Sequence, residues 1–429
     1  MVPLKALGGT SDILPEESVL WQEIESQTRR IMKLYGYEEI RTPVIEEASV
    51  FTRSLGEATE IVTKQMYNFQ DQGGRSVTLR PEGTAPVVRA LIEHGLDKTG
   101  GLLRWYYMGP MFRAERPQAG RKRQFHQLGV EVFGSASPYQ DAEVIQLLFA
   151  LLKAFGLKDF RLRLNTLGCR NERSVMLDAI RQTFKPISRN LCKDCQTRLQ
   201  VNPLRIWDCK QPQCKESRDR AVGAYLVNTG PCQECQDHFK KVQEALESSG
   251  LRKNKDYVLD GTLVRGLDYH TRTVFEVTAP GLGAQDAVAA GGRYDDLVES
   301  MGGVPTPAVG FAIGLDRVLL ARQADQKEQG LSKKNTIKAF IATVNAAQIP
   351  DALALAEELR DKGISSSANL EDRPLKRQLE HAAKLLPDGY VLILGEDEVR
   401  RGIVTVKELS TSQQKKVLRS ELAEALLQK

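Results

Sequence analysis

The densest group of reactive side chains lies between Phe112 and Gln127, where four arginines and one lysine are interrupted by proline and glycine. Guanidinium groups match the oxygens of phosphate groups, so a basic loop of this kind predicts binding of a polyphosphate or of an RNA end. A solvated basic turn is the alternative. Phe125, Gln127 and Glu131 favour a binding site, because an aromatic ring can stack on a base, while an amide and a carboxylate at alternate strand positions can bind a polar substrate.

Three further segments combine glycine with charged residues. Between Arg80 and Thr84, a tight turn carries the Glu82 carboxylate and the Thr84 hydroxyl, which could hold an ammonium group. Arg265 ends an apolar, strand-like run, and Arg317 lies just inside a predicted helix. A single arginine is more often part of a surface ion pair. The chain lacks the G-x-x-x-x-G-K-[ST] phosphate loop, however, so any ATP would have to be held by arginines.

Six of the seven cysteines fall between residues 170 and 257. Two C-x-x-C pairs, Cys192 with Cys195 and Cys232 with Cys235, have the spacing of zinc ligands, and we expect these four residues to form a structural zinc site. Cys209 and Cys214 lie between the two pairs in the sequence. A set of small buried thiols is the alternative. The seventh cysteine, Cys169, lies outside this group and is expected to be structural.

The overall composition limits the range of functions. Lys and Arg number 60 against 55 Asp and Glu in 429 residues, which indicates that any RNA binding is local rather than spread over the surface. The N-terminal residues lack the layout of a secretory signal, and no apolar run approaches the length of a membrane span. Cysteines without an export signal point to a reducing compartment. We therefore expect a cytoplasmic protein that does not contact membranes.

Changes in composition along the chain predict a catalytic domain at 1–325 that contains a cysteine-rich inserted domain at 170–257, a linker at 323–335, and an α/β domain at 336–429. The first helix should end at Gly36. Short apolar runs between turns predict antiparallel strands. These runs are Val77–Leu79, Leu102–Met108, Leu128–Phe133, Gly261–Arg265, Thr273–Val277 and Ala308–Ile313.

Five segments carry a resemblance to a known family. Tyr37–Ile45 resembles the first motif of class II aminoacyl-tRNA synthetases, which forms a dimer contact, Phe112–Phe125 resembles the second motif, and Gly310–Arg317 resembles the third. Leu263–His270 and Ala289–Asp296 resemble the two signatures specific to histidine enzymes. Over nearly its whole length, the chain resembles the histidyl-tRNA synthetase family.

The resemblance implies an α+β fold, in which an antiparallel class II sheet of six strands is flanked by helices and is followed by a mixed α/β anticodon-binding domain. It implies that ATP with Mg²⁺ activates L-histidine to histidyl-adenylate and pyrophosphate. Histidine is then transferred to the 3′ end of tRNA(His), giving AMP. It also implies a homodimer.

The resemblance further implies a role for each matching residue. The residues that would bind histidine are Glu82, Gly83, Thr84, Gln127, Glu131, Arg265, Tyr269 and His270. The residues that would bind ATP are Arg113, Glu115, Arg121, Phe125 and Arg317. Arg113 and Arg265 would face each other across the reacting centre as the catalytic pair, and Gln118 and Arg123 would contact the acceptor end of tRNA. The chain departs from the family at His270 and Lys122, where a tyrosine is common.

Three other functions are open alternatives. A regulatory paralogue that assists ATP phosphoribosyltransferase would keep the fold and bind histidine without charging tRNA. A non-catalytic tRNA-binding protein and a synthetase for another amino acid are the others. The joint presence of Arg113, Arg265 and Arg317 favours an active enzyme, the C-terminal domain argues against the paralogue, and the two signatures favour histidine.

Overall fold

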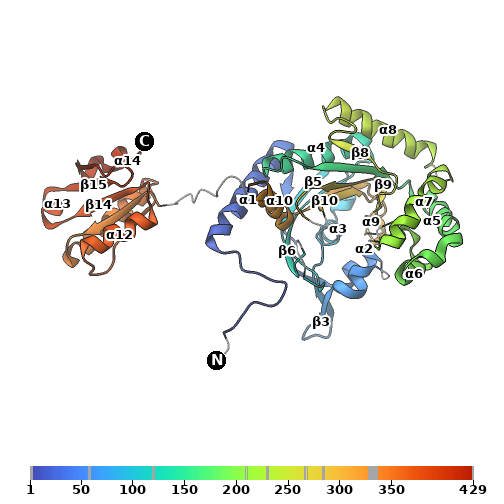
Figure 1. Ribbon diagram of the computed structural model, residues 1–429, viewed down its shortest axis with the longest axis horizontal. Helices are drawn as coiled ribbons and strands as arrows, with labels where there is room; N and C mark the ends of the chain where they lie inside the picture. The colour runs from blue at the N-terminus through green and yellow to red at the C-terminus, as the bar shows by residue number, and fades with distance from the viewer. Residues whose placement is uncertain are drawn as a thin grey trace. The chain divides into compact units, whose positions relative to one another are not determined.

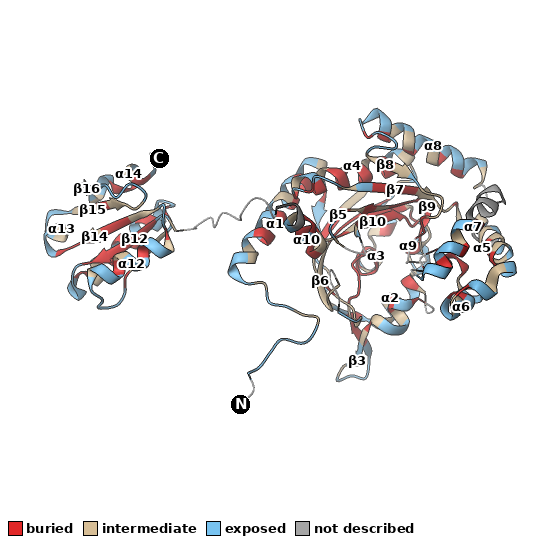
Figure 2. Ribbon diagram, in the orientation of Figure 1, coloured by how far each residue is buried: buried red, intermediate tan, exposed pale blue. Residues whose placement is uncertain are grey.

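The computed structural model describes residues 3–56, 59–117, 121–207, 209, 211–228, 231–264, 267, 269–282, 286–326 and 337–427. The chain divides into two compact units, residues 1–329 and residues 330–429. Figure 1 shows their elements, and Figure 2 shows which parts of each unit are buried.

Among the described residues, the larger unit contains an eight-stranded sheet with the strand order β1-β5-β6-β11-β10-β9-β7-β8. The six strands from β5 to β7 in this order pair antiparallel, and the short edge strands β1 and β8 pair parallel to their neighbours. The strands are β1 (Glu38–Glu39), β5 (Leu103–Phe112), β6 (Gln124–Phe133), β7 (Arg161–Thr166), β8 (Tyr257–Leu259), β9 (Thr271–Thr278), β10 (Ala287–Arg293) and β11 (Ala308–Gly314). This sheet confirms the predicted fold class.

Helices α1 (Pro15–Tyr35), α4 (Pro138–Ala154) and α10 (Leu315–Gln326) pack in the main core of this unit. Helix α4 begins where the Ser137 hydroxyl accepts a hydrogen bond from the Tyr139 N–H at 3.3 Å, and its leucines Leu147, Leu148, Leu151 and Leu152 are fully buried. Each buried leucine contributes about 1.5–3 kcal/mol relative to an exposed one. Helix α1 ends at Gly36, which has a φ of 72°, as the sequence predicts.

A smaller sheet with the order β2-β4-β3 lies beside the main one. Its elements and their neighbours are β2 (Ile45–Glu47), α2 (Ala48–Leu55), the π-helix η1 (Ile61–Gln65), β3 (Tyr67–Gln70), β4 (Ser76–Leu79), α3 (Thr84–Glu93), η2 (Leu96–Lys98) and α9 (Leu297–Ser300). The buried Arg80 guanidinium donates hydrogen bonds to the Pro110 and Thr42 carbonyl oxygens at 2.9 and 3.0 Å. These bonds tie the turn before α3 to the end of β5.

The strand predicted at Gly261–Arg265 is wrong for its described residues 261–264, which form a turn and a short irregular segment. The Asp260 carboxylate accepts hydrogen bonds from the Thr262 N–H at 2.9 Å and from its hydroxyl at 2.6 Å. Such local side-chain bonds favour a turn over a strand ladder.

The segment between β7 and β8 is helical. It contains α5 (Arg170–Phe184), η3 (Lys185–Asn190), α6 (Lys193–Val201), η4 (Pro203–Ile206), α7 (Pro212–Asn228) and α8 (Gln233–Ser248). Helices α5 to α7 gather in a core of their own, in which the rings of Phe184 and Trp207 meet edge to face at 5.4 Å. Helix α8 instead packs on α4, because its buried Val242 and Leu246 belong to the main core. In Figure 1, α8 lies on the side of α4, apart from α6.

In the described part of the smaller unit, a five-stranded sheet has the order β13-β12-β14-β15-β16, with β12, β13 and β14 parallel and the others antiparallel. Its elements are β12 (Ala339–Thr343), η5 (Ala346–Gln348), α11 (Ile349–Asp361), β13 (Ser366–Ala368), α12 (Leu375–Leu385), β14 (Tyr390–Leu394), α13 (Glu396–Arg401), β15 (Ile403–Glu408), β16 (Gln414–Leu418), η6 (Arg419–Glu421) and α14 (Leu422–Leu427). Strand β12 is buried throughout, as expected of a parallel strand covered on both faces.

No helix in the described ranges has both the length and the apolar character needed to span a membrane.

Candidate active site

A cavity of about 400 Å³ opens on the main sheet of the larger unit. Most of the predicted site residues line it, although they come from separate parts of the chain. They are Glu82, Thr84, Arg113, Glu115, Arg121, Phe125, Gln127, Glu131, Tyr269, His270 and Arg317. Arg265 and Gln118 lie outside the described residues. Gly83 and Arg123 are not among the lining residues.

Two buried carboxylates, those of Glu82 and Glu131, form one part of the cavity wall. The Thr84 hydroxyl donates a hydrogen bond to Glu131 at 2.7 Å, and the Tyr294 hydroxyl donates another to its second oxygen. Burial raises the pKa of Glu131 to about 8. We call Glu82, Glu131, Thr84 and Tyr294 the Glu82–Glu131 group.

Glu82 caps the N-terminus of α3. Its two oxygens accept the backbone N–H groups of Thr84 and Ala85, each at 2.8 Å. Burial raises the pKa of Glu82, and these two hydrogen bonds oppose the rise because they stabilise the charged form. The capping fixes the carboxylate in place at the positive end of a helix dipole.

Gly83 contributes to the site by its lack of a side chain. A Cβ atom at Gly83 would lie 2.1 Å from the buried Tyr107 ring, and one at Gly129 would lie 2.0 Å from it. A Cβ atom at Gly310 would lie 2.2 Å from a Glu131 oxygen. These glycines therefore leave the room that Tyr107 and Glu131 occupy.

Tyr269 and His270 line the cavity with stacked, tilted rings whose centroids are 4.7 Å apart. The His270 Nδ1 lies 3.2 Å from the Leu267 carbonyl oxygen, and the side chain is buried. If Nδ1 carries the proton and donates to this carbonyl, Nε2 is a hydrogen-bond acceptor. His270 therefore offers a polar group where the family commonly has a tyrosine.

The second part of the wall is basic, and we call Arg113, Arg121, Lys122 and Arg317 the cationic group. The Arg113 Nε donates to the Pro81 carbonyl oxygen at 2.9 Å, and its guanidinium lies 5.1 Å from the Phe125 ring centroid. Arg121 pairs with Glu115 at 2.9 Å, and Arg317 donates to the Ala287 carbonyl oxygen at 2.6 Å.

Arg113 is placed between the two groups. Burial lowers its pKa, the negative charges of Glu115 and Glu82 oppose this, and the positive charges of Arg121 and Arg317 add to it. Burial and the Arg121 charge also lower the pKa of Arg317. These neighbouring cations repel one another, and a bound polyphosphate would relieve that repulsion.

Several lining residues have no role in the sequence prediction. Asp316 accepts a hydrogen bond from the His126 N–H at 2.7 Å and pairs with Lys122 at 3.0 Å, so it ties the basic loop to the start of α10. Asp316 lies in the segment that resembles the third class II motif, and Tyr294 lies in the second histidine-specific signature. Their position in these segments was the signal in the sequence that could have identified them as lining residues. Lys122, which stands where the family commonly has a tyrosine, is thus part of the cavity wall.

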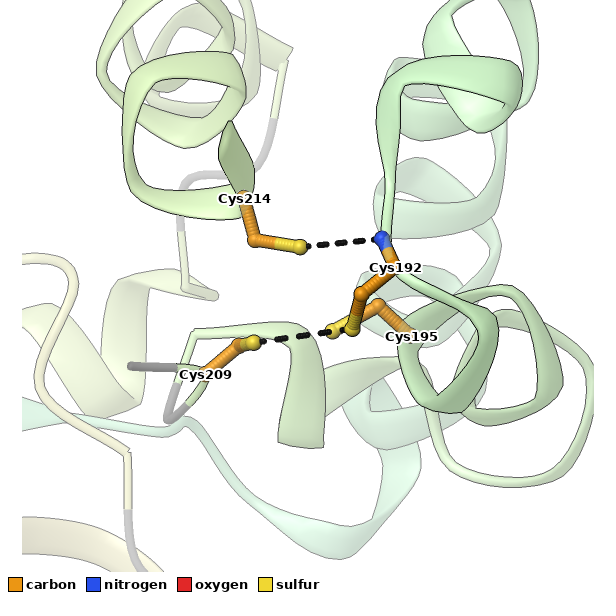
Figure 3. Close-up of side chains that lie close together, drawn as sticks. All are labelled: Cys192, Cys195, Cys209 and Cys214. Atoms are coloured by element: carbon orange, nitrogen blue, oxygen red, sulfur yellow. Dashed lines mark hydrogen bonds between the residues drawn. The ribbon is translucent and has the colours of Figure 1, made fainter. Parts of the chain in front are cut away.

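The predicted zinc quartet is wrong in its grouping. Within the part of the chain that the structure describes, Cys192 and Cys195 lie with Cys209 and Cys214, and all four sulfur atoms are within 4.8 Å of one another (Figure 3). The Cys192 and Cys209 sulfurs are 3.9 Å apart, and the Cys192 N–H donates to the Cys214 sulfur at 3.1 Å. We call these four residues the first cysteine cluster.

Cys232 and Cys235 lie elsewhere, with Cys169 and Glu172. The two C-x-x-C pairs are separated because α8, which carries Cys235, packs on α4 rather than with α6. Cys169, which we placed outside the cysteine group and expected to be structural, belongs to this second group. We call Cys169, Glu172, Cys232 and Cys235 the second cluster.

Comparisons with known proteins cover both units. The family profile for histidyl-tRNA synthetase matches residues 9–175 and 213–318, and that for an anticodon binding domain matches residues 338–429. A histidine–tRNA ligase of Pelotomaculum thermopropionicum is 46% identical over 409 residues, which cover 95% of this chain and 94% of the relative. One from Thermotoga maritima is 44% identical over 425 residues, covering 99% and 98%.

Solved structures agree with the sequence relatives. The apo histidyl-tRNA synthetase of S. aureus is 33% identical, with a TM-score of 0.80 and coverage of 99% of this chain and 100% of that one. An ATP phosphoribosyltransferase regulatory subunit/histidyl-tRNA synthetase from Bacillus halodurans is 25% identical, with a TM-score of 0.62 and coverage of 85% and 92%. Because profile, sequence and structure agree over both units, the chain belongs to the histidyl-tRNA synthetase family.

Proposed function

We propose that this chain is a histidine–tRNA ligase that uses ATP with Mg²⁺. In the first step, a carboxylate oxygen of L-histidine bonds to the α-phosphorus of ATP, the bond to the β-phosphate breaks, and pyrophosphate leaves. In the second step, the terminal ribose hydroxyl of tRNA(His) bonds to the histidyl carbonyl carbon, loses its proton, and AMP leaves. The observation that carries the proposal is that one cavity contains both the buried Glu82–Glu131 group and the cationic group, with Arg113 between them.

In this proposal, the Glu82–Glu131 group and Gln127 bind the ammonium and imidazole of histidine. Glu82 and Thr84 meet the ammonium, whereas Glu131, Tyr269 and His270 read the imidazole. A carboxylate, a phenol and a histidine nitrogen can each hydrogen-bond an imidazole N–H or nitrogen. A site built to hydrogen-bond its substrate rejects analogues without those groups by about 10⁴–10⁵.

The cationic group binds the triphosphate in this proposal. Arg113, with Arg265 as its partner, stabilises the charge that develops on the α-phosphate, and Arg121 and Arg317 hold the outer phosphates together with Mg²⁺. Phe125 and Glu115 seat the adenine. This requires no protein nucleophile, because the substrates supply both attacking oxygens.

The anticodon-binding unit and the basic loop are proposed to bind tRNA(His), with Gln118 and Arg123 at the acceptor end. Arg123 donates to the Gly8 carbonyl oxygen at 3.0 Å and is half-buried. That bond would have to open for Arg123 to reach a phosphate. The proposed compartment is the cytoplasm, where tRNA, ATP and reduced thiols occur together.

A homodimer is proposed from the resemblance of Tyr37–Ile45 to the dimer-forming motif. The segment carries the edge strand β1, and its Ile45 side chain is 52% exposed. An edge strand with a nearby exposed apolar side chain is suited to pairing with a second copy. Light scattering after size exclusion would give about twice the mass of 47.8 kDa for a dimer.

The first cysteine cluster is proposed to bind a structural zinc ion. A tetrahedral zinc with Zn–S bonds of about 2.3 Å separates its sulfurs by about 3.8 Å, close to the 3.9 Å between Cys192 and Cys209. The Cys192 N–H would stabilise the Cys214 thiolate. This ion would hold together the core of α5, α6 and α7.

The test of the main proposal is ATP–pyrophosphate exchange with each of the twenty amino acids, followed by aminoacylation of tRNA(His). Exchange with histidine alone and charging of tRNA(His) are the expected results. Histidine binding without exchange would instead favour the regulatory function named for the Bacillus halodurans relative. Exchange with a different amino acid would overturn the assignment of Glu131, Tyr269 and His270.

A further inference from the structure

The second cluster lies where the helical segment between β7 and β8 begins and where it returns to the main body. We propose that Cys169, Glu172, Cys232 and Cys235 bind a second zinc ion, which clamps these two ends together. This site differs from the first cysteine cluster in its ligands and in its position, and the inference does not depend on the aminoacylation reaction.

The geometry of the four ligands suits a single ion. Their ligand atoms all lie within 4.8 Å of one another, and the Cys169 sulfur is 3.6 Å from a Glu172 oxygen. A tetrahedral ion with bonds of about 2.0–2.3 Å needs separations of about 3.5–3.8 Å, so only a small contraction is required. Three thiolates and one carboxylate favour zinc over the hard cations that prefer oxygen.

The surrounding backbone holds Glu172 toward the cysteines. The Cys169 N–H donates to Glu172 at 3.2 Å, and the Cys232 N–H donates to its other oxygen. Gly168 has a φ of +71°, and a Cβ atom there would lie 2.6 Å from the same carboxylate. The carboxylate thus lies over a position that only glycine leaves open, and it already links the two ends of the segment.

Positive potential converges on this cluster. Cys169 is the N-cap of the 15-residue helix α5, and Cys232 is the N-cap of the 16-residue helix α8, so two helix dipoles point their positive ends at the thiols. Arg272, whose side chain is 19% exposed, lies within electrostatic range of Cys235 and pairs with Glu234. A zinc ion with four anionic ligands has a net charge of −2, which these groups would offset.

The position of the site gives it a consequence for the active site. A small cavity between the two is lined by Cys169 on one side and by Leu267 and His270 on the other, and the last two residues also line the active-site cavity. The Arg272 N–H also donates to the Gly168 carbonyl oxygen at 2.7 Å. Loosening the clamp should therefore disturb the wall that carries His270.

The experiment is zinc stoichiometry by mass spectrometry on the full chain, purified from zinc-supplemented medium under reducing conditions. Wild type should hold two zinc ions per chain. Cys195→Ser and Cys235→Ser should each hold one, and the double variant none. One zinc in wild type that Cys235→Ser retains and Cys195→Ser loses would overturn the second site, as would iron with sulfide in place of zinc.

A milder substitution tests the same site even if Cys235→Ser fails to fold. Glu172→Gln removes one anionic ligand, and Glu244→Gln, an exposed glutamate on α8, is its matched control. Glu172→Gln should lose one zinc to a weak chelator at least tenfold faster than the control while it stays folded by circular dichroism. Equal zinc release from both variants would overturn the proposal.

Cobalt substitution gives an independent readout. The intensity of thiolate-to-cobalt absorption follows the number of bound thiolates, which is seven for both clusters and four for the first alone. The Cys169→Ser variant should fail to retain the second Co²⁺ ion and so lose all three thiolate contributions of the second cluster, which are three-sevenths of the wild-type absorption. Its KM for histidine should rise with an unchanged KM for ATP. Undiminished absorption, or a Cys232–Cys235 disulfide in place of bound metal, would overturn the inference.

Discussion

The Thr84 hydroxyl lies 2.7 Å from a carboxylate oxygen of Glu131, and this contact joins the N-terminus of α3 to strand β6. The other Glu131 oxygen accepts a hydrogen bond from Tyr294, so both oxygens are occupied by hydroxyl donors. This arrangement buries an ionisable group in the wall of the active-site cavity and fixes its orientation.

The stability of the protein should fall as pH rises because of Glu131. Burial raises its pKa from 4.5 to about 8, so the folded state keeps a proton that the unfolded chain releases between these values. The free energy of unfolding then decreases by about 1.4 kcal/mol per pH unit in this window. Glu131→Gln should remove this contribution. Denaturant titrations from pH 5 to pH 8 measure both slopes, and identical slopes would show that Glu131 is charged in the folded protein.

Arg113→Ala should abolish most of the histidine-dependent ATP–pyrophosphate exchange. Loss of one preorganised donor to a developing charge lowers kcat by about 10²–10³. The matched control is Arg75→Ala, which removes an exposed guanidinium from the β3–β4 hairpin that pairs with Asp71. Its exchange rate should stay within about twofold of wild type, since surface substitutions have small effects. Similar losses in the two variants would exclude a specific role for Arg113.

Gly83→Ala should destabilise the protein and weaken histidine binding. The added methyl group would overlap the buried Tyr107 ring, and overpacking of this kind costs about 1–3 kcal/mol. The shift of the turn would also move Glu82 and Thr84. Gly8→Ala is the control, because a Cβ atom there meets nothing within 4 Å. Thermal unfolding and the KM for histidine report the two effects, and a Gly83→Ala variant that matches Gly8→Ala in both would contradict the close packing.

Asp141→Asn should be strongly destabilising because Asp141 neutralises Arg293, and both side chains are fully buried. Asp141 also accepts hydrogen bonds from His238 at 2.8 Å and from Thr273 at 2.6 Å. Breaking a buried ion pair from one side costs about 3–5 kcal/mol. Calorimetry should show a lower Tm for the larger unit.

Asp178→Asn is the control for this experiment, because its exposed carboxylate pairs with Arg181 on the surface of α5. It should change stability by less than about 0.5 kcal/mol. Equal effects of the two substitutions would mean that the Arg293 charge is compensated by another group. Asp295, which lies 3.2 Å from the Arg293 Nε, is the nearest candidate.

Most local elements and many of the residues that line the cavity could be predicted from the sequence. Gly36 ends α1, the apolar runs become β5, β6, β9 and β11, and residues of the second and third class II motifs line one cavity. These features follow from local conformational preference and from the spacing of residues on one strand or one turn. The same local reasoning wrongly predicted a strand at residues 261–264, because the Asp260 side chain forms hydrogen bonds that favour a turn there.

Which distant residues meet depends instead on how the elements pack. Tyr294 reaches Glu131 because β10 and β6 both pair with β11, and Arg293 meets Asp141 across 152 residues. The cysteines show the same limit, since both C-x-x-C pairs have zinc spacing but their partners depend on where each helix packs. Helix α8 buries Val242 and Leu246 against α4 and so carries Cys235 to Cys169 rather than to Cys192. Burial of apolar surface is non-directional and acts between segments far apart in the chain, so the spacing of cysteines could not predict this division.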